Sequence, residues 1–261
     1  MATGLKSVLR TPRSALILKT LIFAGFLLLL KIGSFGLVPI LFFLAAAFSL
    51  FFRPFFQTIP YFISFLIFII LGMFFVARLP GNYFFVGFLF LSFLFYLLSG
   101  VKTLVLVNRS RAYLIFNLAL FYLTFILFFA SGKESSFIGK LLGVFLVSVL
   151  LFRDLFKFQD PPAWPKPLRR GEGPLLSVGW NRRSTVGWVL ALLVVETIWA
   201  INLLPIGFLQ SANLALLSVF ILQDLSLKYF QGVLNRRAIL RDVTIFVLLT
   251  LLIFMTSRWS I

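Results

Sequence analysis

Long apolar runs alternate with short polar connectors along the whole of this 261-residue chain. A helix needs about 20 apolar residues to cross a bilayer core about 30 Å thick. Nine runs approach this length, and we predict a membrane-spanning helix in each. They are Ala15–Leu30, Phe35–Phe52, Ile59–Ala77, Tyr83–Val107, Tyr113–Ala130, Phe137–Phe152, Val186–Leu204, Phe208–Leu225 and Val243–Thr256. The pattern predicts an all-α fold, a polytopic transmembrane helical bundle of about nine spans.

One long connector separates the first six predicted spans from the last three. It contains a proline-dense segment, several glycines and five arginines, a composition typical of a stiff linker rather than a packed domain. We therefore divide the chain into a six-span N-terminal helical bundle over residues 1–152, a Pro/Gly/Arg-rich cytoplasmic linker over residues 153–185, and a three-span C-terminal helical unit over residues 186–261.

The basic residues give the predicted bundle a direction. Short loops on the cytoplasmic side of a membrane are enriched in Lys and Arg. With the N-terminus in the cytoplasm and the C-terminus outside, only five of the 24 basic residues fall outside, namely Lys31, Arg78, Lys133, Lys140 and Arg258. Because an error of one span would disturb this asymmetry, the charge pattern supports both the number of spans and their orientation.

Composition excludes several classes of protein. Hydrophobic residues make up 61% of the chain and charged residues 12%, whereas soluble domains are about one-quarter charged. The net charge of +17 is explained by topology and by contact with anionic lipid at the cytoplasmic face, so we expect no nucleic-acid partner. The chain contains no Cys and no His, which excludes cysteine nucleophiles, Ser–His dyads and His-containing metal sites. We expect no cofactor and no bound metal.

Glu196 is the one acidic residue deep within a predicted span, about 15 Å from the start of that span at 1.5 Å per residue. A carboxylate there must be protonated, paired or in contact with water. Helical spacing places it on one face with Leu192, Trp199, Ala200 and Leu203. Our candidate intramembrane polar site is a seam between the seventh and eighth spans that contains Glu196, Trp199, Asn213 and Gln223. The alternative is a structural hydrogen bond between helices.

Charged residues at the cytoplasmic ends of the last spans are further candidates. Asp224 and Lys228 have the i,i+4 spacing of a helical ion pair. Asp242, at the start of the last apolar run, is expected to cap a helix N-terminus. Six arginines are candidates for contact with anionic lipid, namely Arg169, Arg170, Arg182, Arg183, Arg236 and Arg237.

Three functions fit these residues. The leading prediction is a non-enzymatic scaffold or accessory subunit of a membrane complex, located in the cell membrane, with other membrane proteins as candidate partners. The first alternative is a small transporter or channel that uses Glu196 in the polar seam. The second is a lipid head-group enzyme at the cytoplasmic face, which requires Asp154, Asp224 and the arginines to converge in one pocket.

Overall fold

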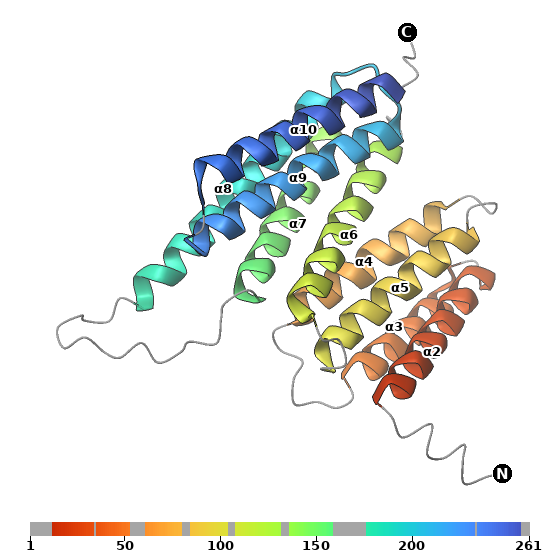
Figure 1. The fold of residues 1–261 in the computed structure, drawn as a ribbon. Coiled ribbons are helices and arrows are strands. Elements are labelled where there is room, and N and C mark those ends of the chain that lie inside the picture. The colour runs from red at the N-terminus through yellow and green to blue at the C-terminus, as the bar shows by residue number, and fades with distance from the viewer. Residues whose placement is uncertain are drawn as a thin grey trace, which may run out of the picture. The chain divides into compact units, whose positions relative to one another are not determined.

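The computed structural model of the chain describes residues 12–33, 35–52, 61–79, 84–103, 108–131, 136–158, 176–232 and 234–256. Within these residues it contains nine helices and no strand, which confirms the predicted all-α class. The helices are α2 (Pro12–Ile32), α3 (Leu37–Phe52), α4 (Phe62–Arg78), α5 (Phe84–Lys102), α6 (Arg109–Ala130), α7 (Phe137–Phe158), α8 (Leu176–Asn202), α9 (Phe208–Phe230) and α10 (Arg236–Thr256) (Figure 1).

Each helix overlaps one of the nine predicted segments, but several helices are longer than the apolar runs. The three shortest predicted segments correspond to α2, α7 and α10, which contain 21, 22 and 21 residues. The linker predicted over residues 153–185 overlaps the end of α7 and the start of α8. Apolar runs mark only the part of a helix that suits lipid, whereas backbone hydrogen bonding continues into polar residues.

Among the described helices, six are long and apolar enough to cross a membrane, namely α2, α5, α6, α8, α9 and α10. Two others, α3 and α4, are apolar but contain only 16 and 17 residues. The remaining helix, α7, carries four charged residues, Lys140, Arg153, Asp154 and Lys157. These apolar helices indicate a membrane-embedded protein, whereas the nine crossings and the cytoplasmic N-terminus stay predictions.

Contacts divide the chain into two compact units, unit 1 (residues 1–119) and unit 2 (residues 120–261). The boundary lies within α6 rather than in a connector. Unit 1 therefore contains α2 to α5 and the first half of α6, and unit 2 contains the second half of α6 and α7 to α10. The six-span and three-span division expected from the linker is a different kind of boundary and stays a prediction.

Stacked aromatic rings form the core of unit 1. The ring of Phe23 on α2 stacks on that of Phe95 on α5, with centroids 4.1 Å apart, and lies 5.5 Å from the ring of Phe43 on α3. Nearer the other end of α2, Lys31 lies 5.7 Å from the ring centroid of Phe84 at the start of α5. Since later residues of α2 meet earlier residues of α5, these two helices are antiparallel.

A buried hydrogen bond also joins α4 to α6 in unit 1. The hydroxyl oxygens of Ser64 and Tyr113 lie 2.7 Å apart. We expect the combined Ser64→Ala and Tyr113→Phe changes to destabilise the fold by less than the sum of the single changes, with a coupling energy of about 0.6 kcal/mol, since interhelical hydrogen bonds in membranes are weak. A double-mutant cycle of unfolding in sodium dodecyl sulfate measures this coupling. Strictly additive effects would show that the two hydroxyls do not stabilise each other.

In unit 2 successive helices pack in series, α7 on α8, α8 on α9 and α9 on α10. The blue helices α9 and α10 lie side by side in Figure 1. The buried residues of α9 include Ser211, Ala212 and Ala215, whose small side chains allow neighbouring helices to approach closely. Only 6% of the apolar window of α10 is buried, so nearly all of this helix is available to lipid or to another protein.

Candidate functional site

Glu196 lies on α8 and is exposed in the structure. The apolar stretch of this helix runs from Ser184 to Asn202, so Glu196 is about 18 Å from its start and about 9 Å from its end at 1.5 Å per residue. The buried side of α8 consists of apolar residues, namely Leu190, Ala191, Val194, Ile198 and Ile201. Glu196 therefore lies away from the packed side of its helix, within the stretch that is apolar enough to cross a membrane.

The residues that helical spacing places beside Glu196 are exposed with it. Leu192 is 51% exposed, Trp199 54% and Leu203 68%, and Ala200 is exposed as well. We call these five residues the Glu196 face. Within the described part of the chain, Glu196 makes neither a hydrogen bond nor an ion pair. An acidic residue thus lies in the middle of an otherwise apolar, uncovered face.

The structure does not bring the four residues of the predicted polar seam together. Glu196, Trp199 and Asn213 are exposed, whereas Gln223 is only 1% exposed. Gln223 also lies ten residues beyond Asn213 on α9, about 15 Å along the helix axis. Helical periodicity assigned the members of the Glu196 face correctly, but it did not show that this face lies outside the contact between α8 and α9.

An ionic cluster joins α9 to α10. Lys228 donates a hydrogen bond to Asp224 one turn earlier on α9, and its Nζ lies 2.5 Å from a carboxylate oxygen of Asp242 on α10. Asp242 also accepts a hydrogen bond of 3.3 Å from Arg241. The expectation that Asp242 caps a helix N-terminus is wrong, because α10 begins six residues earlier, at Arg236. Asp242 instead lies inside the helix and pairs with Lys228.

The predicted anionic-lipid arginines are only partly described. Arg169 and Arg170 lie outside the described residues. Arg182 and Arg183 fall within α8, but their own side chains are not described. Arg236 and Arg237 form the start of α10 and are exposed. Their contact with anionic lipid stays a prediction.

Carboxylates of unit 2 do not form a metal centre in the part of the chain that the structure describes. No group of three Asp, Glu, His or Cys residues there is placed to hold a metal ion. Asp154 is buried on α7, while Asp224 and Asp242 are both bound to Lys228. Both carboxylates are thus held by an ammonium group, whereas a general base must be free to approach the proton of a substrate.

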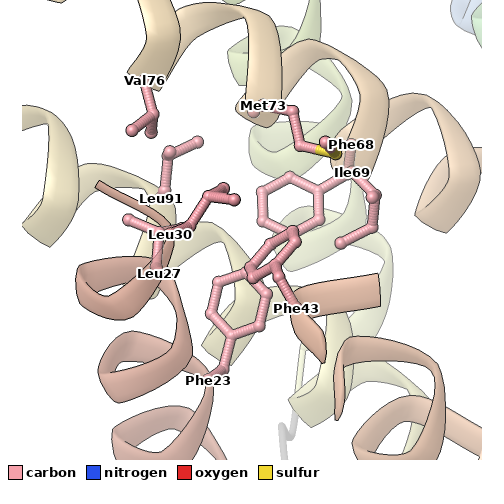
Figure 2. Close-up of a pocket in the computed structure, with 10 residues that line it drawn as sticks. Phe23, Leu27, Leu30, Phe43, Phe68, Ile69, Met73, Val76 and Leu91 are labelled. Atoms are coloured by element: carbon pink, nitrogen blue, oxygen red, sulfur yellow. The ribbon is translucent and has the colours of Figure 1, made fainter. Parts of the chain in front are cut away.

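Figure 2 shows an apolar recess in unit 1, between α2, α3, α4 and α5. Its ten lining residues are Phe23, Leu27, Leu30, Phe43, Phe68, Ile69, Gly72, Met73, Val76 and Leu91. None carries an acid, a base or a nucleophile, so this recess offers no catalytic chemistry.

The structure also identifies Lys102, which sequence reasoning missed. It is the last residue of α5 and only 4% exposed, although a lysine beside a connector is normally expected in water. A signal was present in the sequence, because the first 133 residues contain basic residues but no Asp or Glu.

Comparison of the chain with protein-family models, curated proteins and solved structures finds no match.

Proposed function

We propose that this protein is a non-enzymatic subunit or scaffold of a membrane complex, and that the Glu196 face of α8 contacts a membrane-spanning helix of another protein. The exposure of Glu196 within the apolar stretch of α8 carries this proposal. A charged group at the centre of a bilayer is unfavourable by about 2.5–3.5 kcal/mol on insertion scales. Contact with a hydrogen-bond donor from a second protein offsets this penalty.

The chemistry of the face specifies the kind of partner. Glu196 accepts hydrogen bonds, so it fits a helix that carries a Lys, Arg, Ser, Thr or Asn side chain at matching depth. Leu192, Trp199 and Leu203 supply apolar contact around that polar pair, and Ala200 allows close approach of the partner backbone. A polar pair enclosed by apolar residues also fixes the register of two helices, which suits an assembly role.

The other candidate functions gain less support. Transport through the seam requires Glu196 to line a path between helices, whereas this residue is exposed on the outer side of α8. A head-group enzyme requires free carboxylates near one another, whereas Asp224 and Asp242 are paired with Lys228.

A photo-cross-linking side chain at Leu203 tests the proposal in native membranes. We expect one dominant protein adduct, and we expect Glu196→Leu to lower its yield about 5-fold or more, since an interhelical hydrogen bond contributes about 1–2 kcal/mol in model helices. Glu196→Gln retains hydrogen-bonding groups and is expected to preserve most of the yield.

Thr197→Val is the matched control, because the Thr197 hydroxyl donates to the Leu193 carbonyl within α8, at 2.7 Å. This change should leave the adduct unchanged. Adducts with lipid alone, or equal yields of protein adduct from the wild type and from Glu196→Leu, would contradict the proposal. A product of twice 29.7 kDa containing only this chain would replace the foreign partner with a second copy.

A further inference from the structure

Lys102 holds its ammonium group inside unit 1. The Nζ donates a hydrogen bond to the backbone oxygen of Phe51, in the last turn of α3. It also lies 4.7 Å from the centroid of the Phe51 ring. A lysine ammonium has three N–H donors, and the Phe51 carbonyl occupies one of them. The group is therefore fixed at the end of α3 and still has donors for a further acceptor.

Unit 1 contains no side chain that can neutralise this charge. Residues 1–119 include ten Lys and Arg residues and no Asp or Glu; all seven acidic residues lie in unit 2. Lys228 in unit 2 shows the contrasting arrangement, since it binds two carboxylates. An ammonium that is buried without an anion is strongly unfavourable. We therefore expect Lys102 to bind an anion, and unit 1 does not provide one.

A second ammonium lies near the first. Lys19 of α2 is half-buried, and its charge repels that of Lys102. The antiparallel packing of α2 and α5 explains the proximity, because Phe23 stacks on Phe95 one turn further along α2. Two like charges in a partly desolvated region repel each other, and an anion between them turns the repulsion into attraction.

We propose that Lys102 and Lys19 form a binding site for a phosphate group, which we infer to be the head-group phosphate of an anionic lipid. The site lies where α3 and α5 end. On the predicted topology this end of unit 1 faces the cytoplasmic leaflet, where anionic lipids are concentrated. The site is separate from the six arginines named above and from the Glu196 face, so it stands independently of the proposed function.

Native mass spectrometry of the full chain in detergent tests this site. Wild-type protein is expected to retain dioleoyl phosphatidylglycerol in preference to dioleoyl phosphatidylcholine. Lys19→Gln and Lys102→Gln are each expected to weaken phosphatidylglycerol binding about 5-fold, in keeping with the contribution of one basic residue near an anionic surface. Binding of phosphatidylcholine should not change.

Lys31→Gln is the matched control. Lys31 likewise donates to a backbone carbonyl, that of Leu79 at 3.3 Å, and lies over the Phe84 ring, but at the opposite end of α2. The Lys31→Gln variant should retain the wild-type preference for phosphatidylglycerol over phosphatidylcholine. Equal loss in Lys31→Gln and Lys19→Gln, or no preference for phosphatidylglycerol in the wild type, would overturn the proposal. If Lys102→Gln fails to fold, Lys19→Gln decides the question, because Lys19 is only half-buried.

Inorganic phosphate distinguishes the two sources of this ligand. If it displaces phosphatidylglycerol at millimolar concentration from the wild type but has no such effect in Lys19→Gln, the site recognises free phosphate as well. If it fails to displace the lipid while both lysine variants lose lipid, the site recognises the head group in its membrane setting. Either result supports a phosphate site at Lys102 and Lys19.

Discussion

Replacing Phe23 with alanine is expected to lower the free energy of unfolding by about 3 kcal/mol, the lower end of the range for buried phenylalanines. The Phe23 ring is 1% exposed and contacts the rings of Phe43, Phe68 and Phe95. It therefore holds α2 against three other helices of unit 1. The transfer contribution is small in lipid, which is as apolar as the protein interior, so most of the loss comes from ring contacts and the cavity left behind.

Leu21→Ala provides the control for this prediction, since Leu21 lies on the same helix and is 64% exposed. It should change the free energy of unfolding by less than about 0.5 kcal/mol. Unfolding in mixed micelles of increasing dodecyl sulfate fraction measures both variants. Equal losses for Phe23→Ala and Leu21→Ala would show that the aromatic cluster does not hold unit 1 together.

Replacing Lys228 with methionine is expected to lower the free energy of unfolding by about 2 kcal/mol, between the values for exposed and for buried ion pairs. The Lys228 side chain is 17% exposed and that of Asp242 only 7%. Methionine keeps the length of the side chain but removes the cation that Asp224 and Asp242 share, and leaves Asp242 only the exposed Arg241. Because Lys228 joins α9 to α10, we expect α10 to separate first, seen as faster hydrogen exchange in Arg236–Thr256.

Two further variants separate charge pairing from packing at Lys228. Arg241 also contacts Asp242, but its side chain is 65% exposed, so Arg241→Gln should lower stability by less than about 0.5 kcal/mol. Adding Asp242→Asn to Lys228→Met should recover part of the loss, since it removes the charge of a buried carboxylate that has lost its ion pair with Lys228. A double variant no more stable than Lys228→Met alone would show that the lysine acts through packing.

The partners that we propose for the Glu196 face and for the Lys102 site differ in chemistry. Glu196 is an acid exposed within the apolar stretch of α8, and the partner that we propose for it is a helix of another membrane protein. Lys102 is a base buried at the end of a helix in a unit without acids, and the partner that we propose for it is the head-group phosphate of an anionic lipid. Both proposals pair a polar group of this chain with a neighbour in the membrane rather than with a substrate.

The sequence by itself determined the helices. A run of apolar residues in lipid must satisfy its own backbone hydrogen bonds, so length and hydropathy suffice to locate each helix. The 3.6-residue period also grouped Leu192, Trp199 and Leu203 with Glu196 correctly. The ion pair between Asp224 and Lys228 is equally local, because residues four apart on a helix are neighbours.

Only the tertiary structure decided which side of each helix is covered. In a soluble protein the apolar side faces inward, but lipid and protein interior are equally apolar, so the residues around α8 do not reveal its packed side. For this reason the Glu196 face was predicted to lie in a seam and is found exposed. Two further contacts depend on how two helices align: the ion pair between Asp242 and Lys228, and the hydrogen bond from Lys102 to the Phe51 carbonyl. No periodicity within one helix contains that information.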